Sequence, residues 1–238
     1  MERHAACFAR VANVTAWRPG SWWHLVVAAV VLVGCGDRGE DAALRYVGLG
    51  DSYTIGTSVG EGDRWPNQLV ERVDSLELVG NPAVNGYTSA DLIDDELPRL
   101  DALRPEFISV LIGVNDVVQG VPDSLYAGNV AVILDELLAH VPSNRIVCVA
   151  TPDYTVTPSG GAFGDPAQQS DAIVRFNAIL REACEQREIS FVPEIFEISQ
   201  AAQADPSLVA DDGLHPSRKQ YSLWVDAIEP VVRALIEG

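Results

Sequence analysis

The stretch RYVGLGDSYTIG, Arg45 to Gly56, changes character halfway along. Its first half, RYVGLG, has the apolar character of a buried strand, and its second half begins with the polar residues Asp51 and Ser52. In open α/β folds, ligands bind outside the carboxyl ends of the strands. The function therefore depends on whether Ser52 is a turn residue or a nucleophile.

Strand-like and helix-like segments alternate along the rest of the chain. Apolar runs of strand length lie at Phe107–Gly113 and Arg145–Ala150, with a weaker strand at 76–84 and a short one at 189–192. Helical spacing begins at Trp65, and a second helix is expected after Ser89, the candidate N-cap. Further helices are expected in the segment that ends at His140, over Asp171–Arg187 and from about Tyr221. This alternation predicts an α/β fold of three layers, α/β/α, around a doubly wound parallel sheet of about five strands. The flavodoxin-like strand order 2-1-3-4-5 fits this number of strands.

Composition narrows the class of protein. The chain has 238 residues, and 47% of them are hydrophobic, which is enough for a substantial core. Its formal net charge is −18. A phosphate backbone would be repelled by such a surface, so nucleic-acid binding is excluded as a function. The charge is interpreted as a well-solvated acidic surface.

The N-terminal residues form a separate unit. Three arginines precede the apolar run Leu25–Gly34, which has the length of a signal-peptide core and is short for a membrane span. The run ends in LVGC, Leu32–Cys35, which resembles the lipobox of bacterial lipoproteins. This resemblance implies a signal peptide at 1–34, a lipidated Cys35 with a tether at 35–44, and a domain at 45–238. The expected location is the bacterial cell envelope, with the protein held at the membrane by the lipid on Cys35; a soluble secreted or periplasmic protein is the alternative.

Polar side chains stand where the predicted strands end. The blocks are GDSY (Gly50–Tyr53), NGYTS (Asn85–Ser89), GVND (Gly113–Asp116) and, near the C-terminus, DDGLHPS (Asp211–Ser217). In this order they resemble the SGNH hydrolases, the GDSL-type esterases and lipases. The matching residues are Ser52, Gly86, Asn115 and His215, with Asp212 at the acid position and Tyr53 in place of a common leucine. The resemblance runs from about Arg45 to the C-terminus.

The chemistry of these residues supports the resemblance independently. A serine hydroxyl becomes an effective nucleophile when an adjacent base takes its proton, and histidine is suited to this near neutral pH. Among the four histidines, His4 and His24 lie in the leader and His140 ends a predicted helix, so His215 is the expected base. Asp212 lies three residues before His215, near enough in one turn to orient the ring, with Asp211 as the competing acid.

The resemblance also implies an oxyanion hole. Its donors are the backbone N–H groups of Ser52 and Gly86 and the side-chain amide of Asn115, which donates while remaining neutral. Asp51 and Asp116 are expected to hold the surrounding loops by hydrogen bonds. Each matched residue also has a purely structural interpretation, such as a helix cap at Ser52. Four coincidences at one sheet edge are nevertheless harder to explain than one active site.

The expected activity is that of a serine esterase that forms an acyl-enzyme, acts on a small-molecule ester and needs no metal or cofactor. The family also hosts carbohydrate O-acetyl esterases, lysophospholipases and thioesterases. The polar, Gly- and Pro-rich segment Asp153–Asp171 is expected to wall the site and lacks the pattern of a lipase lid. We therefore expect a shallow site that accepts short acyl groups, from acetyl to butyryl. Tyr53, Trp65 and Tyr87 can line this pocket or pack in the core.

Two functions of other classes stay open on the sequence. A flavodoxin-like FMN-binding protein needs a Ser- and Thr-rich phosphate loop, for which residues 50–58 are a faint candidate. A catalytically inactive envelope binding module is the other, and the complete set of catalytic residue types counts against it. Cys148 and Cys184 match no metal motif and are interpreted as buried free thiols, with a disulfide between them left open.

Overall fold

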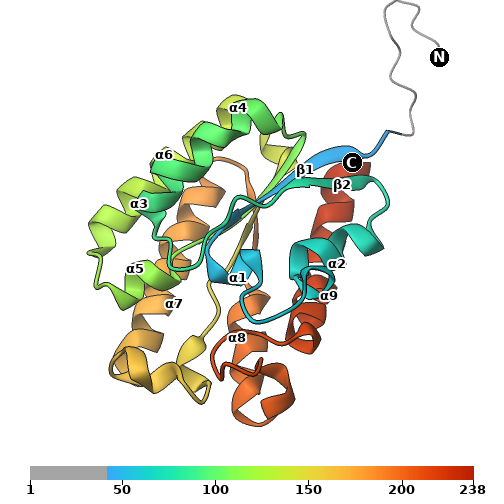
Figure 1. Cartoon of the computed structure of the whole chain (residues 1–238). Coiled ribbons are helices and arrows are strands. Elements are labelled where there is room, and N and C mark those ends of the chain that lie inside the picture. The colour runs from blue at the N-terminus through green and yellow to red at the C-terminus, as the bar shows by residue number, and fades with distance from the viewer. Residues whose placement is uncertain (1–41) are drawn as a thin grey trace, which may run out of the picture. The chain divides into compact units, whose positions relative to one another are not determined.

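Parallel strands form the centre of residues 42–238, the part of the chain that the computed structural model describes (Figure 1). The five-stranded sheet has the order β2-β1-β3-β4-β5. Its strands are β1 (Leu44–Gly50), β2 (Leu76–Gly80), β3 (Phe107–Leu111), β4 (Ile146–Val149) and β5 (Ser190–Val192). All four neighbouring pairs are parallel, which confirms the predicted doubly wound order.

Helices cover both faces of the sheet, as the three-layer prediction requires (Figure 1). One face carries α2 (Trp65–Arg72), α8 (Glu194–Gln200) and α9 (Arg218–Glu237). The other carries α3 (Ser89–Asp91), α4 (Leu100–Leu103), α5 (Val114–Val118), α6 (Asp123–His140) and α7 (Pro166–Glu185). None of the described helices is long and apolar enough to cross a membrane. The predicted leader 1–34, Cys35 and the tether up to residue 41 lie outside the described residues.

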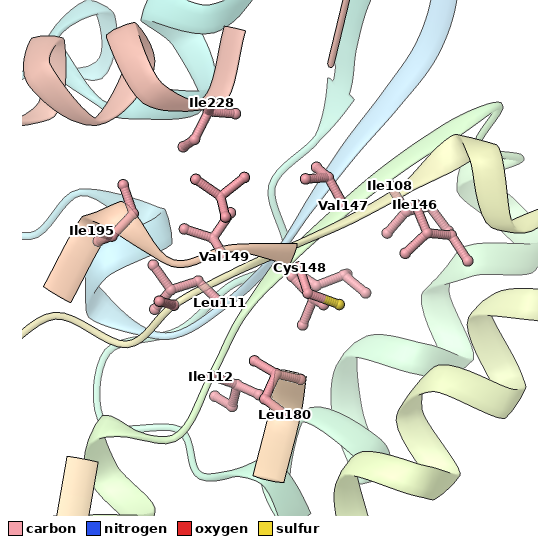
Figure 2. Packing of buried hydrophobic residues seen from close by; sticks show 14 of the residues in the cluster. Ile108, Leu111, Ile112, Ile146, Val147, Cys148, Val149, Leu180, Ile195 and Ile228 are labelled. Carbon is pink, nitrogen blue, oxygen red and sulfur yellow. The ribbon is translucent and has the colours of Figure 1, made fainter. Parts of the chain in front are cut away.

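The core consists of side chains that alternate across the central strands (Figure 2). Val147 and Val149 of β4 point toward the face that carries Ile228 of α9, whereas Cys148 points toward the face that carries Leu180 of α7. All five side chains are buried. Strands covered on both faces by helices have no polar side, which is why β3 and β4 are continuous apolar runs in the sequence.

Several helices begin earlier than the sequence predicted. The N-cap of α3 is Thr88 and not Ser89, because Thr88 and Asp91 form a reciprocal capping box. Asp165 caps α7, which begins at Pro166 rather than Asp171, and Ser217 caps α9, which begins before Tyr221. The predicted helix from Ser89 is also interrupted, by a π-helical turn at Leu92–Glu96 and a 3₁₀ turn at Leu97–Arg99.

The strand register places the predicted blocks beside one another. Gly50, the last residue of β1, pairs with Leu111, the last residue of β3. The turns that follow these two strands carry Ser52 and Asn115 and therefore start at the same edge of the sheet. The loop after β4 and the loop 211–215 contact each other, since the N–H of Ser159 donates to the carbonyl oxygen of Gly213 at 2.8 Å, and residues of both loops line one cavity with Ser52.

Candidate active site

Ser52 occupies a sharp turn between β1 and the short helix α1 (Ser52–Ile55). Gly50 makes the bend with a φ of +147°, and a Cβ there would stand 2.2 Å from the carbonyl oxygen of Leu111, so only glycine fits. The carboxylate of Asp51 caps α1 by accepting from the N–H of Tyr53 at 2.9 Å. Ser52 is therefore the first residue of the helix and not its cap.

Ser52 and His215 line one cavity of about 110 Å³. Its apolar wall comes from residues on α5, on the loop after β4 and beside His215: Val114, Val118, Tyr154, Phe163 and Leu214. A larger cavity, of about 220 Å³, lies beside Arg181, Phe191 and Glu197, but neither serine nor histidine lines it. The smaller cavity is the one that brings a nucleophile and a base together.

His215 is held by a carboxylate of its own loop. Its Nδ1 lies 2.6 Å from Oδ2 of Asp212, and its backbone N–H donates to Oδ1 of the same side chain at 3.0 Å. The ring is 7% exposed and packs against the ring of Tyr53, with centroids 5.1 Å apart. With Nδ1 donating to Asp212, the other ring nitrogen, Nε2, is left as the acceptor. The competing acid, Asp211, is exposed.

The carboxyl group of Asp212 is kept ionised. Partial burial acts to raise its pKa, but hydrogen bonds from Ser58, from the His215 ring and from the N–H groups of Leu214 and His215 outweigh this and hold the pKa well below its usual range. Ser58 Oγ donates to Oδ2 at 2.6 Å, and the Leu214 N–H donates to Oδ1 at 2.9 Å. A carboxylate with this set of donors remains charged wherever a neutral imidazole can act as a base.

Two backbone N–H groups at the site have no hydrogen-bond partner among residues 42–238. One belongs to Ser52, at the start of α1, and the other to Gly86. Gly86 has a φ of +88°, which glycine adopts readily, and the space where a Cβ would stand is open. The neighbouring Asn85 lines the cavity with Ser52, whereas Gly86 itself does not. Unpaired N–H donors are what an oxyanion needs where it forms.

Asn115, on α5, connects the turns of the first two blocks. Its Nδ2 donates to the Tyr87 carbonyl oxygen at 2.9 Å and to Oδ2 of Asp51 at 3.3 Å. The next residue, Asp116, is fully buried and accepts from both the N–H (2.8 Å) and the hydroxyl (2.5 Å) of Ser89. Asp51 and Asp116 therefore hold the loops by hydrogen bonds, as the sequence predicted.

The profile of the GDSL-like lipase/acylhydrolase family matches residues 49–223, most of the described domain. The chain belongs to this family. It is therefore a carboxylic ester hydrolase by family, and the match favours this class over the flavodoxin-like and inactive-module alternatives.

Two curated relatives match nearly the whole hydrolase. Thioesterase 1/protease 1/lysophospholipase L1 of Escherichia coli K12 is 23% identical over 218 residues, which cover 90% of this chain and 94% of the relative. An arylesterase of Vibrio mimicus is 26% identical over 203 residues, with coverages of 83% and 92%. The crystal structure of an acetylxylan esterase from Geobacillus stearothermophilus superimposes with a TM-score of 0.62 at 18% identity, covering 80% of this chain and 94% of that one. That likeness shows the shared fold.

The three candidate pocket aromatics of the hydrolase have three different positions. Tyr53 lines the cavity, and the hydroxyl of Tyr221 donates to the carbonyl oxygen of Tyr53 at 3.0 Å. Trp65 is fully buried in the core. Tyr87 is half-buried, donates from its hydroxyl to Asp95 at 2.6 Å, and meets the site through its carbonyl oxygen. Of the three, Tyr53 alone is placed to touch an acyl group.

The loop after β4 faces the cavity, as expected for a wall. It contains one-turn helices at Tyr154–Val156 and Gly160–Phe163. The Phe163 ring is 39% exposed and meets the Tyr154 ring edge-on, with centroids 5.9 Å apart. Behind this loop, Cys148 and Cys184 are buried free thiols, the state that the sequence favoured.

A second acid, Glu96, is buried behind the nucleophile turn. Glu96 is the last residue of the π-helical turn and is fully buried. Its Oε2 accepts a hydrogen bond from the N–H of Gly50 at 3.0 Å, and its Oε1 has no partner among the described residues. Burial, with a smaller contribution from neighbouring acids, raises the pKa of Glu96 to about 8 and that of Asp51 to about 7. Both carboxyl groups of the hydrolase therefore hold their protons to a higher pH than ordinary carboxyl groups do.

This burial predicts a pH-dependent stability. The folded-state pKa of Glu96 lies above the ordinary value of 4.5. The contribution of Glu96 to the free energy of unfolding is therefore fully present below pH 4.5 and is lost as the pH rises through about 8. Glu96→Gln keeps an acceptor for Gly50 and cannot ionise. We expect thermal unfolding midpoints to fall less steeply between pH 4.5 and 8 in Glu96→Gln than in the parent, each pKa unit being worth roughly 1.4 kcal/mol. The exposed Glu77→Gln is the matched control, and parallel curves for Glu96→Gln and the parent would contradict the assignment.

Two residues of this site were not predicted from the sequence, Glu96 and Ser58. Glu96 had a detectable signal, because it lies four residues after Leu92 and four before Leu100, on the stripe that a helix buries. Ser58 had none: its contact with Asp212 joins residues 154 positions apart.

Proposed function

We propose that the protein is a serine esterase that hydrolyses short-acyl carboxylic esters through an acyl-enzyme. Ser52 is the nucleophile, His215 the general base and then acid, and Asp212 the residue that orients the ring. The observation that carries the proposal is that Ser52 and His215 line one cavity while Asp212 contacts Nδ1 of His215 at 2.6 Å. A histidine oriented by a carboxylate can take the proton of a neighbouring serine hydroxyl once Oγ and Nε2 come within hydrogen-bond reach.

The reaction proceeds in two halves. Oγ of Ser52 attacks the ester carbonyl carbon while Nε2 of His215 takes the hydroxyl proton, and the carbonyl oxygen becomes an oxyanion. The C–O bond to the alcohol then breaks, and His215 returns the proton to the leaving oxygen. A water molecule, deprotonated by His215, attacks the acyl-enzyme. Collapse of the second oxyanion releases the acid and restores the Ser52 hydroxyl.

The oxyanion is stabilised by three donors in this proposal. The unpaired N–H groups of Ser52 and Gly86 are available without rearrangement. The Asn115 amide is already engaged, but its bond to Asp51 is long, at 3.3 Å, and that hydrogen is the one an oxyanion can take over. The raised pKa of Asp51, about 7 because of burial, weakens its competition for this hydrogen.

The size of the cavity supports a small acyl group. A roughly 150 Å³ apolar cavity holds one benzene-sized molecule, and this one, about 110 Å³, is smaller. Val114, Val118 and Leu214 provide apolar contacts for the first few carbons, each methylene being worth up to about 0.8 kcal/mol when buried. Later carbons have no further wall to contact.

We expect kcat/KM for nitrophenyl esters to be highest from acetyl to butyryl and to decline beyond about eight acyl carbons. The measurement is a chain-length series with the purified protein, corrected with Ser52→Ala for non-enzymatic hydrolysis. A steady rise toward twelve carbons would contradict the small-pocket assignment.

A second candidate substrate class follows from the same cavity. An acetyl group on a carbohydrate hydroxyl is as small as the acyl groups above, and one fold relative is an acetylxylan esterase. The lysophospholipase and thioesterase activities named for the Escherichia coli relative are the other alternative. A panel of acetylated sugars, lysophospholipids and acyl thioesters separates them, and the cavity favours the acetylated sugars.

A further inference from the structure

Ser58 has an unusual backbone for a serine. Its φ is +68°, in the left-handed region, which among the described non-glycine residues only Arg104 and Glu188 share. Such a conformation is unfavourable for a residue with a Cβ and persists where the surroundings require it. The Ser58 hydroxyl donates to Oδ2 of Asp212 at 2.6 Å.

The other donors to Asp212 belong to its own loop. The N–H groups of Leu214 and His215 bind Oδ1, and Nδ1 of His215 binds Oδ2. These contacts give the loop 211–215 its internal shape and move with it. They do not fix the distance between the loop and the nucleophile.

Ser58 links the loop 211–215 to the turn that carries Ser52. The N–H groups of Gly56 and Thr57 both donate to the carbonyl oxygen of Ser52 at 3.0 Å, so the chain folds back tightly after the nucleophile. Ser58 follows directly, and its hydroxyl reaches the oxygen of Asp212 that His215 also contacts. A single hydrogen bond thus ties the turn of the nucleophile to the carboxylate of the acid.

On the opposite side, Ser159 holds the same loop by its backbone. Its N–H donates to the Gly213 carbonyl oxygen at 2.8 Å, and its hydroxyl to that of Asp212 at 3.2 Å. These contacts steady the main chain of the loop without touching the carboxylate. The His215 ring also packs against Tyr53, but the hydrogen bond that reaches the carboxylate from the nucleophile turn comes from Ser58.

We propose that Ser58 is a positioning residue, whose hydroxyl fixes Asp212, and through it the His215 ring, in register with Ser52. The inference rests on the proposed function, because it gives Ser58 a role only if Asp212 orients the base. A small misplacement of a base relative to its nucleophile is enough to slow proton transfer markedly. The left-handed backbone of Ser58 is explained as the conformation that aims its hydroxyl at Asp212.

The test separates the hydroxyl from the backbone. Ser58→Gly removes the donor and relieves the positive φ, so we expect kcat to fall about tenfold, KM to stay nearly unchanged, and the unfolding midpoint to stay level or rise. Ser58→Asn keeps a donor on a residue that tolerates the left-handed region, so it should recover kcat to within about threefold of the parent.

A double-mutant cycle with Asp212→Asn shows whether Ser58 acts through the acid. In that background Ser58→Gly should change kcat by less than about twofold, because the group that it positions is already lost. The same tenfold cost in both backgrounds, or a parent-like kcat in Ser58→Gly, would overturn the inference and leave the proposed function intact. A parent-like kcat in Asp212→Asn alone would instead overturn the assignment of Asp212, and the role of Ser58 with it.

Discussion

The Ser52→Ala variant should lose roughly 10⁵-fold in kcat while its fold survives. Without Oγ no acyl-enzyme forms, and only the binding groups and the oxyanion donors remain to accelerate attack by water. The Ser52 hydroxyl makes no hydrogen bond within residues 42–238, so its removal should leave the unfolding midpoint near that of the parent. The measurement is kcat for nitrophenyl butyrate, together with a thermal unfolding curve.

The matched control is Ser75→Ala, at an exposed serine just before β2, which should retain parent activity. A folded Ser52→Ala that turned over substrate within tenfold of the parent would exclude Ser52 as the nucleophile. The cavity would then have to act through another group.

The Asp212→Asn variant should lose about 10⁴-fold in kcat, whereas Asp211→Asn should stay close to the parent. An asparagine at 212 can still be placed beside His215, but its uncharged amide does not stabilise the imidazolium and favours the wrong ring tautomer. The carboxylate that contacts the ring is that of Asp212, and no hydrogen bond joins Asp211 to His215 among residues 42–238.

Rates for the two variants should be compared from pH 6 to 8. The pKa of Asp212 is held well below its usual range by hydrogen bonds from Ser58, His215 and backbone N–H groups that outweigh the effect of burial. Asp212 therefore stays charged over this range, and Asp212→Asn should be the slower variant at every pH in it. The reverse ranking would move the acid to Asp211.

Much of the fold could be predicted from the sequence because the strands are short apolar runs with clear ends. β3 and β4 are buried on both faces, so they contain almost no polar residue that obscures their limits. Helix starts were harder to predict. The capping residue of α7 is Asp165, followed by Pro166, a local signal that was present but lay inside a segment interpreted as a loop.

The interruption of the helix after Ser89 has a different cause. Glu96 turns inward to meet the N–H of Gly50, and the π-helical turn that accommodates it depends on a strand 46 residues away. Helical periodicity places Glu96 on a buried stripe, but it describes neighbours along one element and so gives no sign of the contact with Gly50 or of the π-helical turn.

The candidate site also contains residues that could be predicted from the sequence and residues that could not. Ser52, Gly86, Asn115, Asp212 and His215 were predicted because each belongs to a block that a family shares. Ser58 and Glu96 support those blocks from outside and were not predicted. Their positions follow from tertiary contacts, with Asp212 and with Gly50, that only the folded chain makes.

Covalent labelling tests the central claim, that Ser52 is a nucleophile activated by His215, most directly. A fluorophosphonate probe should modify one residue of the native protein, and mass spectrometry of the peptides should locate it at Ser52. His215→Ala should label far more slowly and Ser52→Ala not at all, with all three proteins shown to be folded. A probe attached to another residue, or equal labelling rates in the parent and His215→Ala, would contradict the account.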